Sequence, residues 1–160
     1  MTVSSSIQAI ALDFDGVLTD GSVLWGPEGQ EWKRLSFRDI MGVSLASKAG
    51  FHFGIISGEN SPLVERFAKK MDIRHVFLGS KDKAANFREL SAALSLAPGQ
   101  LAYMGDDVND LEAMQLAGLS AAPSDAHPAV LNRASFRSKF PGGNGAVREL
   151  VDHLLAGRKP

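Results

Sequence analysis

Short apolar runs alternate with helical patterns along this chain, and the alternation restricts the fold more than any other feature. The runs suit buried strands and occupy residues 7–12, 51–56, 74–78, 101–104 and 119–122. Helical patterns lie between or after them, at about 41–49, 61–71, 83–94, 109–118 and 146–155. Strands that alternate with helices form right-handed crossovers, so we expect an α/β fold with a mainly parallel sheet and helices on both faces.

One segment interrupts this rhythm. Residues 22–36 contain two short strand-like stretches around the turn at 26–29, which predicts a β-hairpin inserted after the first strand. Its tryptophans, Trp25 and Trp32, suit a subunit interface better than a sugar site. No other insertion is large enough for a cap domain. With 160 residues, 44% of them hydrophobic, the sequence predicts a single domain over residues 1–160.

The charge balance argues against polyanionic partners. Seventeen basic and 18 acidic side chains leave a net charge of −1, so neither nucleic acid nor an anionic membrane is an expected partner. The chain has no cysteine, which fits a reducing compartment. Residues 1–6 do not resemble a secretion signal and no apolar run is long enough to span a bilayer. We therefore expect a cytoplasmic protein.

Polar side chains follow four of the predicted strands. Because ligands bind beyond the carboxyl ends of strands in an open parallel sheet, these residues should converge on one site. The candidates are Asp13 and Asp15 after the first strand, Ser57 and Gly58 after the second, Lys81 or Lys83 after the third, and Asp106, Asp107 and Asp110 after the fourth.

Such a set of carboxylates predicts a metal site. Asp13 and Asp15 would point to the same side of an extended chain, roughly 7 Å apart. Several ionised carboxylates share a small site only if a cation neutralises them, and oxygen ligands favour Mg²⁺. A metal that bridges carboxylates to an anionic substrate indicates phosphate chemistry.

Each residue type has a corresponding task in phosphate-ester cleavage. Asp13 can attack phosphorus and form an aspartyl-phosphate, while Asp15 protonates the leaving alcohol and later activates water. Ser57 and the backbone at Gly58 can hold phosphoryl oxygens, and Lys83 can offset their charge. The expected metal ligand after the fourth strand is Asp106, with Asp107 and Asp110 in the second shell, where Asp110 orients the water around the ion. Asp107 would alternatively be a further ligand or an exposed neighbour.

Four segments resemble the four motifs of the haloacid dehalogenase superfamily, in the expected order. They are DFDGVLTDG at 13–21, IISG at 55–58, Lys83, and MGDDVND at 104–110. Further segments resemble the capless branch that contains 3-deoxy-D-manno-octulosonate 8-phosphate phosphatase: FRD at 37–39, SDAHP at 124–128 and GGNGAVRE at 142–149.

This resemblance implies a Rossmann-like phosphatase that depends on Mg²⁺. It implies Asp13 as nucleophile, Asp15 as acid/base and as a metal ligand through its backbone carbonyl, and Asp106 as the metal-ligating aspartate. It also implies a homotetramer in which the hairpin packs against neighbours and helps to cover the site. The expected substrate is the phosphate of a 3-deoxy-2-ulosonic sugar acid, most simply octulosonate 8-phosphate.

Substrate-binding candidates are Glu59, Arg66 and Arg148. Glu59 stands where the octulosonate phosphatases have arginine, which keeps a nonulosonate 9-phosphate as an alternative substrate; it also suits an exposed helix start. Phe67 stands where a later arginine is usual, with Arg66 adjacent. Arg148 follows a glycine loop that would either hold an anion or lie as a solvated surface loop. Alternatives of other classes are a catalytically quiet tetrameric regulatory subunit and a phosphotransferase.

Overall fold

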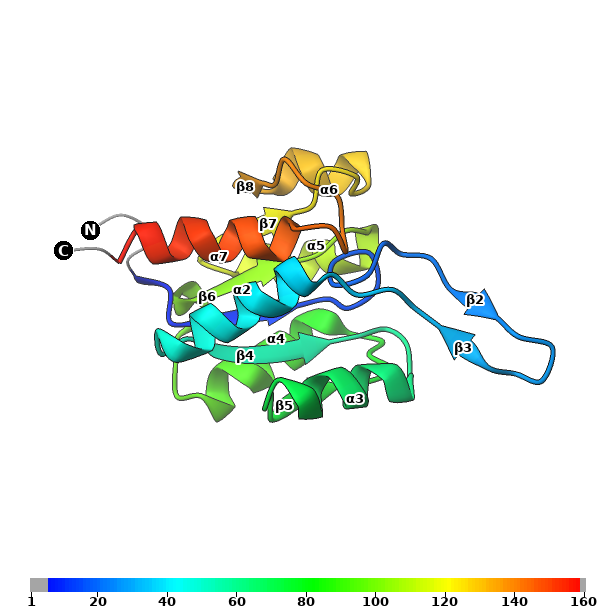
Figure 1. The fold of residues 1–160 in the computed structure, drawn as a ribbon. Helices are drawn as coiled ribbons and strands as arrows, with labels where there is room; N and C mark the ends of the chain where they lie inside the picture. Colours follow the sequence, from blue (N-terminus) through cyan, green and yellow to red (C-terminus); the bar gives the residue numbers. More distant parts are fainter. Residues whose placement is uncertain (1–5, 159–160) are drawn as a thin grey trace.

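The computed structural model describes residues 6–158, and its centre is a six-stranded sheet (Figure 1). Residues 1–5, which belong to the segment expected not to be a secretion signal, lie outside the described residues. The strand order is β5-β4-β1-β6-β7-β8, and every neighbouring pair is parallel. The strands are β1 (Ala9–Leu12), β4 (His52–Ile56), β5 (His75–Phe77), β6 (Leu101–Met104), β7 (Leu119–Ala122) and β8 (Phe136–Arg137). The predicted α/β class is confirmed.

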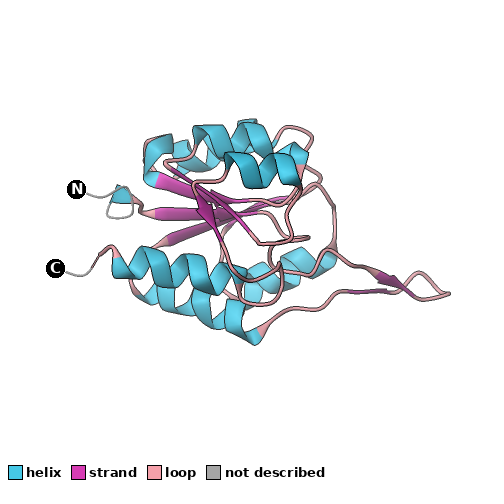
Figure 2. Ribbon diagram, turned by 90° about the horizontal axis from the view of Figure 1, so that it is seen from above, coloured by secondary structure: helices cyan, strands magenta, loops and turns pink. Residues whose placement is uncertain are grey.

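Helices cover both faces of the sheet (Figure 2). Side chains of β1 alternate between the two cores: Ile10 and Leu12 face one, Ala9 and Ala11 the other. The first core includes side chains of α2 (Phe37–Lys48), α3 (Pro62–Lys70) and α7 (Ala146–Ala156). The second includes side chains of α4 (Lys83–Ala93), α5 (Leu111–Leu116) and α6 (Pro128–Arg133). The central strand is thus buried on both faces, as its unbroken apolar run requires.

Side-chain caps decide where the helices begin. Ser61 caps α3 by accepting a hydrogen bond from the Leu63 N–H at 3.3 Å, with Pro62 first in the helix as predicted. The helix expected from residue 41 begins at Phe37 instead, because Ser36 accepts a hydrogen bond from the Arg38 N–H.

The carboxyl half differs from the predicted elements in two ways. The helix expected over 109–118 is divided into a 3₁₀ turn, η2 (Val108–Asp110), and α5. The short elements α6 and β8, and the 3₁₀ turn η1 (Pro98–Gln100), were not predicted. These elements are too short to produce a clear hydrophobic period.

The hairpin is present and extends away from the body of the molecule (Figures 1 and 2). It pairs β2 (Leu24–Trp25) with β3 (Glu31–Trp32) in antiparallel register. Trp25 is 77% exposed, so no other part of residues 6–158 buries its ring. A bridge between Thr19 and Leu35 joins the base of the hairpin to the turn that follows β1.

Across residues 6–158, every helix is too short or too polar to serve as a membrane span.

Candidate active site

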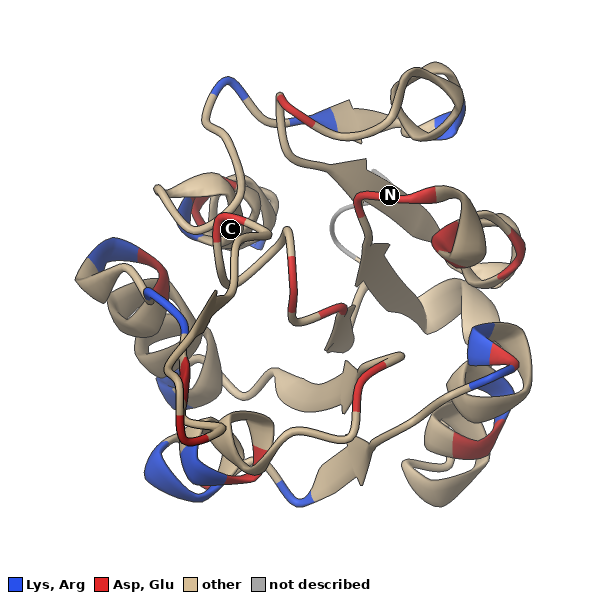
Figure 3. Ribbon diagram, turned by 90° about the vertical axis from the view of Figure 1, so that its right-hand side faces the viewer, with Lys and Arg blue, Asp and Glu red and all other residues tan. Residues whose placement is uncertain are grey.

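Acidic residues gather at the carboxyl edge of the sheet, which faces the viewer in Figure 3. The chain leaves β1 toward β4 and β5, then returns to the other side of β1 to form β6. Such a reversal opens a crevice at the strand ends. A cavity of about 240 Å³ lies there, lined by Asp13, Asp15, Gly21, Ser57, Gly58, Glu59, Lys83, Asp106, Asp107 and Asn109.

Lys83 joins two carboxylates beneath this cavity. Its Nζ donates to Asp13 Oδ2 and to Asp110 Oδ1, each at 2.8 Å, and all three side chains are buried. Burial and the charge of Asp110 raise the pKa of Asp13 well above its ordinary value, although Lys83 acts in the opposite direction. Burial alone would lower the pKa of Lys83, but the two carboxylates outweigh it and raise that pKa. The ammonium therefore stays charged beside Asp13.

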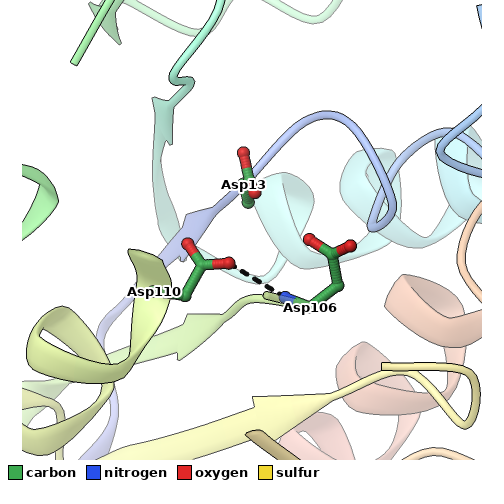
Figure 4. Close-up of side chains that lie close together, drawn as sticks. All are labelled: Asp13, Asp106 and Asp110. Carbon is green, nitrogen blue, oxygen red and sulfur yellow. Dashed lines mark hydrogen bonds between the residues drawn. The ribbon is translucent and has the colours of Figure 1, made fainter. Parts of the chain in front are cut away.

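Asp110 is engaged by the protein on both carboxylate oxygens. Oδ1 accepts from the Tyr103 hydroxyl at 2.6 Å as well as from Lys83, and Oδ2 accepts from the backbone N–H groups of Asp106 and Asp107 at 3.0 and 3.1 Å. Figure 4 shows the bond to Asp106. Asp110 therefore holds Lys83 and the loop after β6 in place. Tyr103 was not a candidate, because in sequence it belongs to an apolar strand.

The carboxylates fit a divalent cation. Oxygen atoms of Asp13, Asp106 and Asp110 lie within 4.8 Å of one another (Figure 4). With Lys83 included, three carboxylates and one ammonium leave two uncompensated negative charges when all are ionised. Burial, followed by the charge of Asp110, raises the pKa of Asp106 to about 6. Each Asp110 oxygen accepts two hydrogen bonds, whereas each Asp13 oxygen accepts one, Oδ1 from the Phe14 N–H at 2.7 Å and Oδ2 from Lys83. Asp13 and Asp106 are therefore the carboxylates with oxygen lone pairs left for Mg²⁺.

Asp15 is held from the hairpin side. Its carboxylate lies 2.9 Å from Lys33 Nζ and accepts a 3.4 Å hydrogen bond from the Thr19 hydroxyl. Thr19 also accepts from the N–H groups of Gly16 and Gly21, so it shapes the turn that follows β1. Sequence reasoning missed Lys33, which appeared to be an ordinary charged residue in a hairpin.

The opposite wall of the cavity comes from the loop after β4. Ser57 is buried, and its hydroxyl accepts a hydrogen bond from the Glu59 N–H at 3.2 Å. A side chain at Gly58 would have Asn109 Nδ2 as its nearest neighbour, 3.8 Å away. Asn109 thus faces this wall, although the sequence did not single it out. Glu59 is exposed at the rim, before the cap of α3.

Comparison with known proteins agrees with this geometry. A family model described as haloacid dehalogenase-like hydrolase matches residues 76–150. The 3-deoxy-D-manno-octulosonate 8-phosphate phosphatase of Salmonella typhi is 39% identical over 155 residues, which cover 97% of this chain and 82% of the relative. The chain belongs to the haloacid dehalogenase-like hydrolases. The predicted resemblance is confirmed, and with these relatives the chain is a phosphoric monoester hydrolase.

Solved structures of such hydrolases share the whole fold. The octulosonate 8-phosphate phosphatase of Yersinia pestis superposes with a TM-score of 0.95 at 36% identity, covering 98% of this chain and 84% of that one. The enzyme of Moraxella catarrhalis, solved with magnesium ion, phosphate ion and KDO, has a TM-score of 0.95 at 31% identity and covers 98% and 90%. The cobalt-bound enzyme of Haemophilus influenzae has a TM-score of 0.95 at 32% identity, covering 98% and 92%.

Two substrate-binding candidates of this hydrolase lie outside the carboxylate cavity. Arg66 lines an adjoining groove of about 190 Å³, together with Phe14, Lys33, Leu35, Leu63, Phe67 and Lys70. Arg148 is directed away, with Nε 3.0 Å from both carboxylate oxygens of Asp152. Phe67 is a core residue whose ring packs edge-on against Phe14 at 5.7 Å.

The glycine loop at 142–145 acts as a support for the catalytic edge. Gly143 N–H donates to the Val17 carbonyl at 2.9 Å, while Asp125 accepts from Gly142 N–H. A Cβ at Gly142 would lie 1.9 Å from the Gly16 carbonyl, so only glycine permits this approach. The N–H groups of Gly142, Gly143 and Gly145 all donate to acceptors within the protein, so they are not free to hold an anion.

The FRD segment completes that support. The buried carboxylate of Asp39 accepts from the N–H groups of Gly145 and Arg148, both at 3.0 Å, and so caps the start of α7. The segments that resembled the capless branch therefore include residues that brace the turn after β1 rather than line the cavity.

Proposed function

We propose that this hydrolase cleaves the phosphate monoester of a 3-deoxy-2-ulosonic sugar acid with Mg²⁺, through an aspartyl-phosphate on Asp13. The observation that carries the proposal is the Lys83–Asp13 pair, 2.8 Å apart, beside the Asp106 carboxylate at the base of a cavity. A buried carboxylate next to an ammonium and a cation site suits attack on a phosphate dianion, because its charge is offset before the substrate arrives.

In the first step, a carboxylate oxygen of Asp13 forms a bond to phosphorus and the bond from phosphorus to the ester oxygen breaks. Asp15 gives its proton to the departing alkoxide. In the second step, Asp15 takes a proton from water as the water oxygen bonds to phosphorus. The bond from phosphorus to Asp13 then breaks and inorganic phosphate leaves. After both steps, Asp15 has returned to its protonated starting state.

The remaining residues stabilise charge during both steps. Ser57, the backbone at Gly58 and Lys83 are placed around the cavity to hold phosphoryl oxygens. Asp13, Asp106 and the Asp15 backbone carbonyl would hold Mg²⁺, which would supply charge neutralisation at the phosphoryl group.

The substrate class rests on the relatives and on the adjoining groove. The relatives named above act on octulosonate 8-phosphate, and the Moraxella enzyme was solved with KDO. The groove is lined by Lys33, which pairs with Asp15 of the active site, and by Arg66 and Lys70, cations that suit a sugar-acid carboxylate. Glu59 at the rim favours a nonulosonate 9-phosphate as the second candidate, because its carboxylate can accept hydrogen bonds from additional hydroxyl groups.

The test is a phosphate-release panel with octulosonate 8-phosphate, nonulosonate 9-phosphates and simple sugar phosphates in Mg²⁺. We expect release from one ulosonate ester and a loss of at least about 1,000-fold in Asp13→Asn, because the nucleophile is removed. Asp152→Asn, a change to an exposed carboxylate of α7 that does not line the cavity, should leave the rates unchanged. Full activity in Asp13→Asn, or no release from either ester, would refute the proposal.

The panel repeated with Glu59→Arg addresses specificity. A shift in preference toward octulosonate 8-phosphate is expected if Glu59 contacts the sugar. An unchanged preference would remove Glu59 from the substrate-binding set.

We further propose that the hydrolase is a cytoplasmic homotetramer whose hairpins pack against neighbouring subunits. The exposed apolar side chains of the hairpin and of the start of α2 support this: Leu24, Trp25, Trp32 and Phe37. Light scattering of the purified chain should give a tetramer, and Trp25→Asp should dissociate it. A monomeric parent chain would contradict the assembly, and cell fractionation tests the compartment.

A further inference from the structure

We propose that Lys33 is a positioning residue for Asp15, carried to the active site by the base of the inserted hairpin. This inference rests on the proposed role of Asp15 as the proton donor to the leaving group. Lys33 lies just after β3, yet its side chain is only 6% exposed and its Nζ is 2.9 Å from the Asp15 carboxylate. A lysine in an extended hairpin is normally solvated, so its burial at this point needs a specific reason.

Lys33 is itself held by its surroundings. Glu31 Oε1 lies 3.5 Å from its Nζ and also accepts a hydrogen bond from the Ser61 hydroxyl at 3.1 Å. Ser61 is the residue that caps α3, so the hairpin base is tied to the helix that follows the Ser57 loop. The ammonium also lies 6.0 Å from the centre of the Phe14 ring.

Asp15 depends on this contact for its orientation. The Asp15 side chain is part-exposed, and its hydrogen bond from Thr19 is long at 3.4 Å. A side chain with one weak partner would rotate, whereas a hydrogen bond from the fixed Lys33 ammonium restricts it. When Asp15 carries the proton, one of its oxygens can still accept this bond while the other donates to the leaving oxygen. Proton donation to a leaving oxygen requires this alignment, because general acids act only within hydrogen-bond reach.

If Lys33 positions the general acid, the effect of removing it should depend on the basicity of the leaving group. An acid is needed when the departing oxygen is strongly basic and is almost dispensable when it is weakly basic. Phenyl phosphate and p-nitrophenyl phosphate differ in this respect but share their ring and their phosphate. Their kcat/KM values report the steps up to departure of the leaving group, before water attacks the aspartyl-phosphate.

We expect Lys33→Met to lower kcat/KM for phenyl phosphate and for octulosonate 8-phosphate by about 10- to 100-fold, part of what a general acid contributes. The loss for p-nitrophenyl phosphate should be only about 3-fold or less, by the same argument. Asp15→Asn should show the same selectivity more strongly, and Lys33→Arg should recover part of the loss because it keeps the charge.

Arg34→Met is the matched control. Arg34 is the next residue, is also paired with an aspartate (Asp20, at 3.2 Å), and has a side chain that is 74% exposed. It should behave as the parent chain on both aryl esters.

The outcomes separate this inference from the proposed function. Equal losses on both aryl esters, or an unchanged ratio with a loss on the sugar ester alone, would overturn the positioning role, even if the parent chain proves to be the expected phosphatase. A parent chain that releases no phosphate from any ester would overturn both.

Discussion

Lys83 Nζ lies 2.8 Å from Asp13 Oδ2, and this contact joins the start of α4 to the end of β1 across 70 residues of sequence. The same ammonium lies 2.8 Å from Asp110, so one cation neutralises part of the charge of two buried carboxylates. The Lys83–Asp13 contact therefore contributes both to the stability of the fold and to the proposed phosphate chemistry.

Replacing Lys83 by methionine should abolish phosphate release and weaken the fold. Asp13 and Asp110 would lose their common buried partner, and breaking a buried ion pair from one side costs about 3–5 kcal/mol. Phosphate release and urea unfolding measure the two effects. Lys81→Met is the control, since Lys81 is exposed on the preceding loop. Equal losses in both variants would show that Lys83 has no special role.

Gly16→Ala should displace Asp106 and weaken Mg²⁺ binding by at least about 10-fold, which corresponds to about 1.4 kcal/mol. A Cβ at Gly16 would lie 2.0 Å from Asp106 Oδ2, and the residue has φ +83°. Gly29 has nearly the same φ, +84°, but nothing lies within 4 Å of its Cβ position. Gly29→Ala therefore reproduces the backbone strain without the collision. Calorimetric titration with Mg²⁺ compares the two, and equal affinities would contradict the placement of Asp106.

Mg²⁺ affinity should fall as the pH is lowered below 6. Without metal the pKa of Asp106 is about 6, so Mg²⁺ must displace a proton at lower pH. One proton predicts a Kd about 10-fold weaker at pH 5 than at neutral pH, and the raised pKa of Asp13 would steepen the dependence. Calorimetry at several pH values tests this; a flat profile would contradict the assignment.

The same shift has a consequence for the metal-free fold. The folded pKa of Asp106 lies above its ordinary value of 3.8, so the folded state binds more protons between about pH 4 and 6. The contribution of Asp106 to stability is therefore present at low pH and is lost as the pH rises through this window. Thermal unfolding without Mg²⁺ should show this loss, and Asp106→Asn should reduce it.

Tyr103→Phe should cost about 1–2 kcal/mol of folding stability, because it removes one donor from the buried Asp110 carboxylate. The ring contact with Phe87, 5.8 Å between centroids, is retained. Urea unfolding measures the loss, and Phe87→Leu provides a control that alters packing alone. A variant as stable as the parent would show that Lys83 and the two backbone N–H groups suffice for Asp110.

The motif residues that the sequence singled out are largely those that the fold brings together. Asp13, Asp15, Ser57, Lys83 and Asp106 all follow predicted strands and all line one cavity. This was predictable because parallel strands place their carboxyl ends at one edge. The roles of these residues in catalysis remain predictions that the experiments above test.

Residues held by long-range contacts could not be inferred in the same way. In sequence, Tyr103 resembles its apolar neighbours in β6 and Lys33 resembles any hairpin lysine. Their contacts in the site could not be inferred, because these depend on the other elements that pack against each residue. Arg66 was inferred from its place beside Phe67 and Arg148 from the glycine loop before it. Neither inference could tell that Arg66 lines a separate groove or that Arg148 pairs with Asp152, because one step along a helix turns a side chain by about 100°.

By itself, the amino-acid sequence determined the strand–helix alternation, the parallel sheet and the convergence of carboxylates on one edge. The hydrophobic period is a local property, and strands joined through helices run parallel, with their carboxyl ends at one edge. The tertiary structure alone decided that Asp110 holds Lys83 instead of facing the cavity, and that the hairpin base delivers Lys33 to Asp15. The physical reason is that a buried charge takes its partner from whatever element packs against it, and the sequence order of two residues does not reveal that packing.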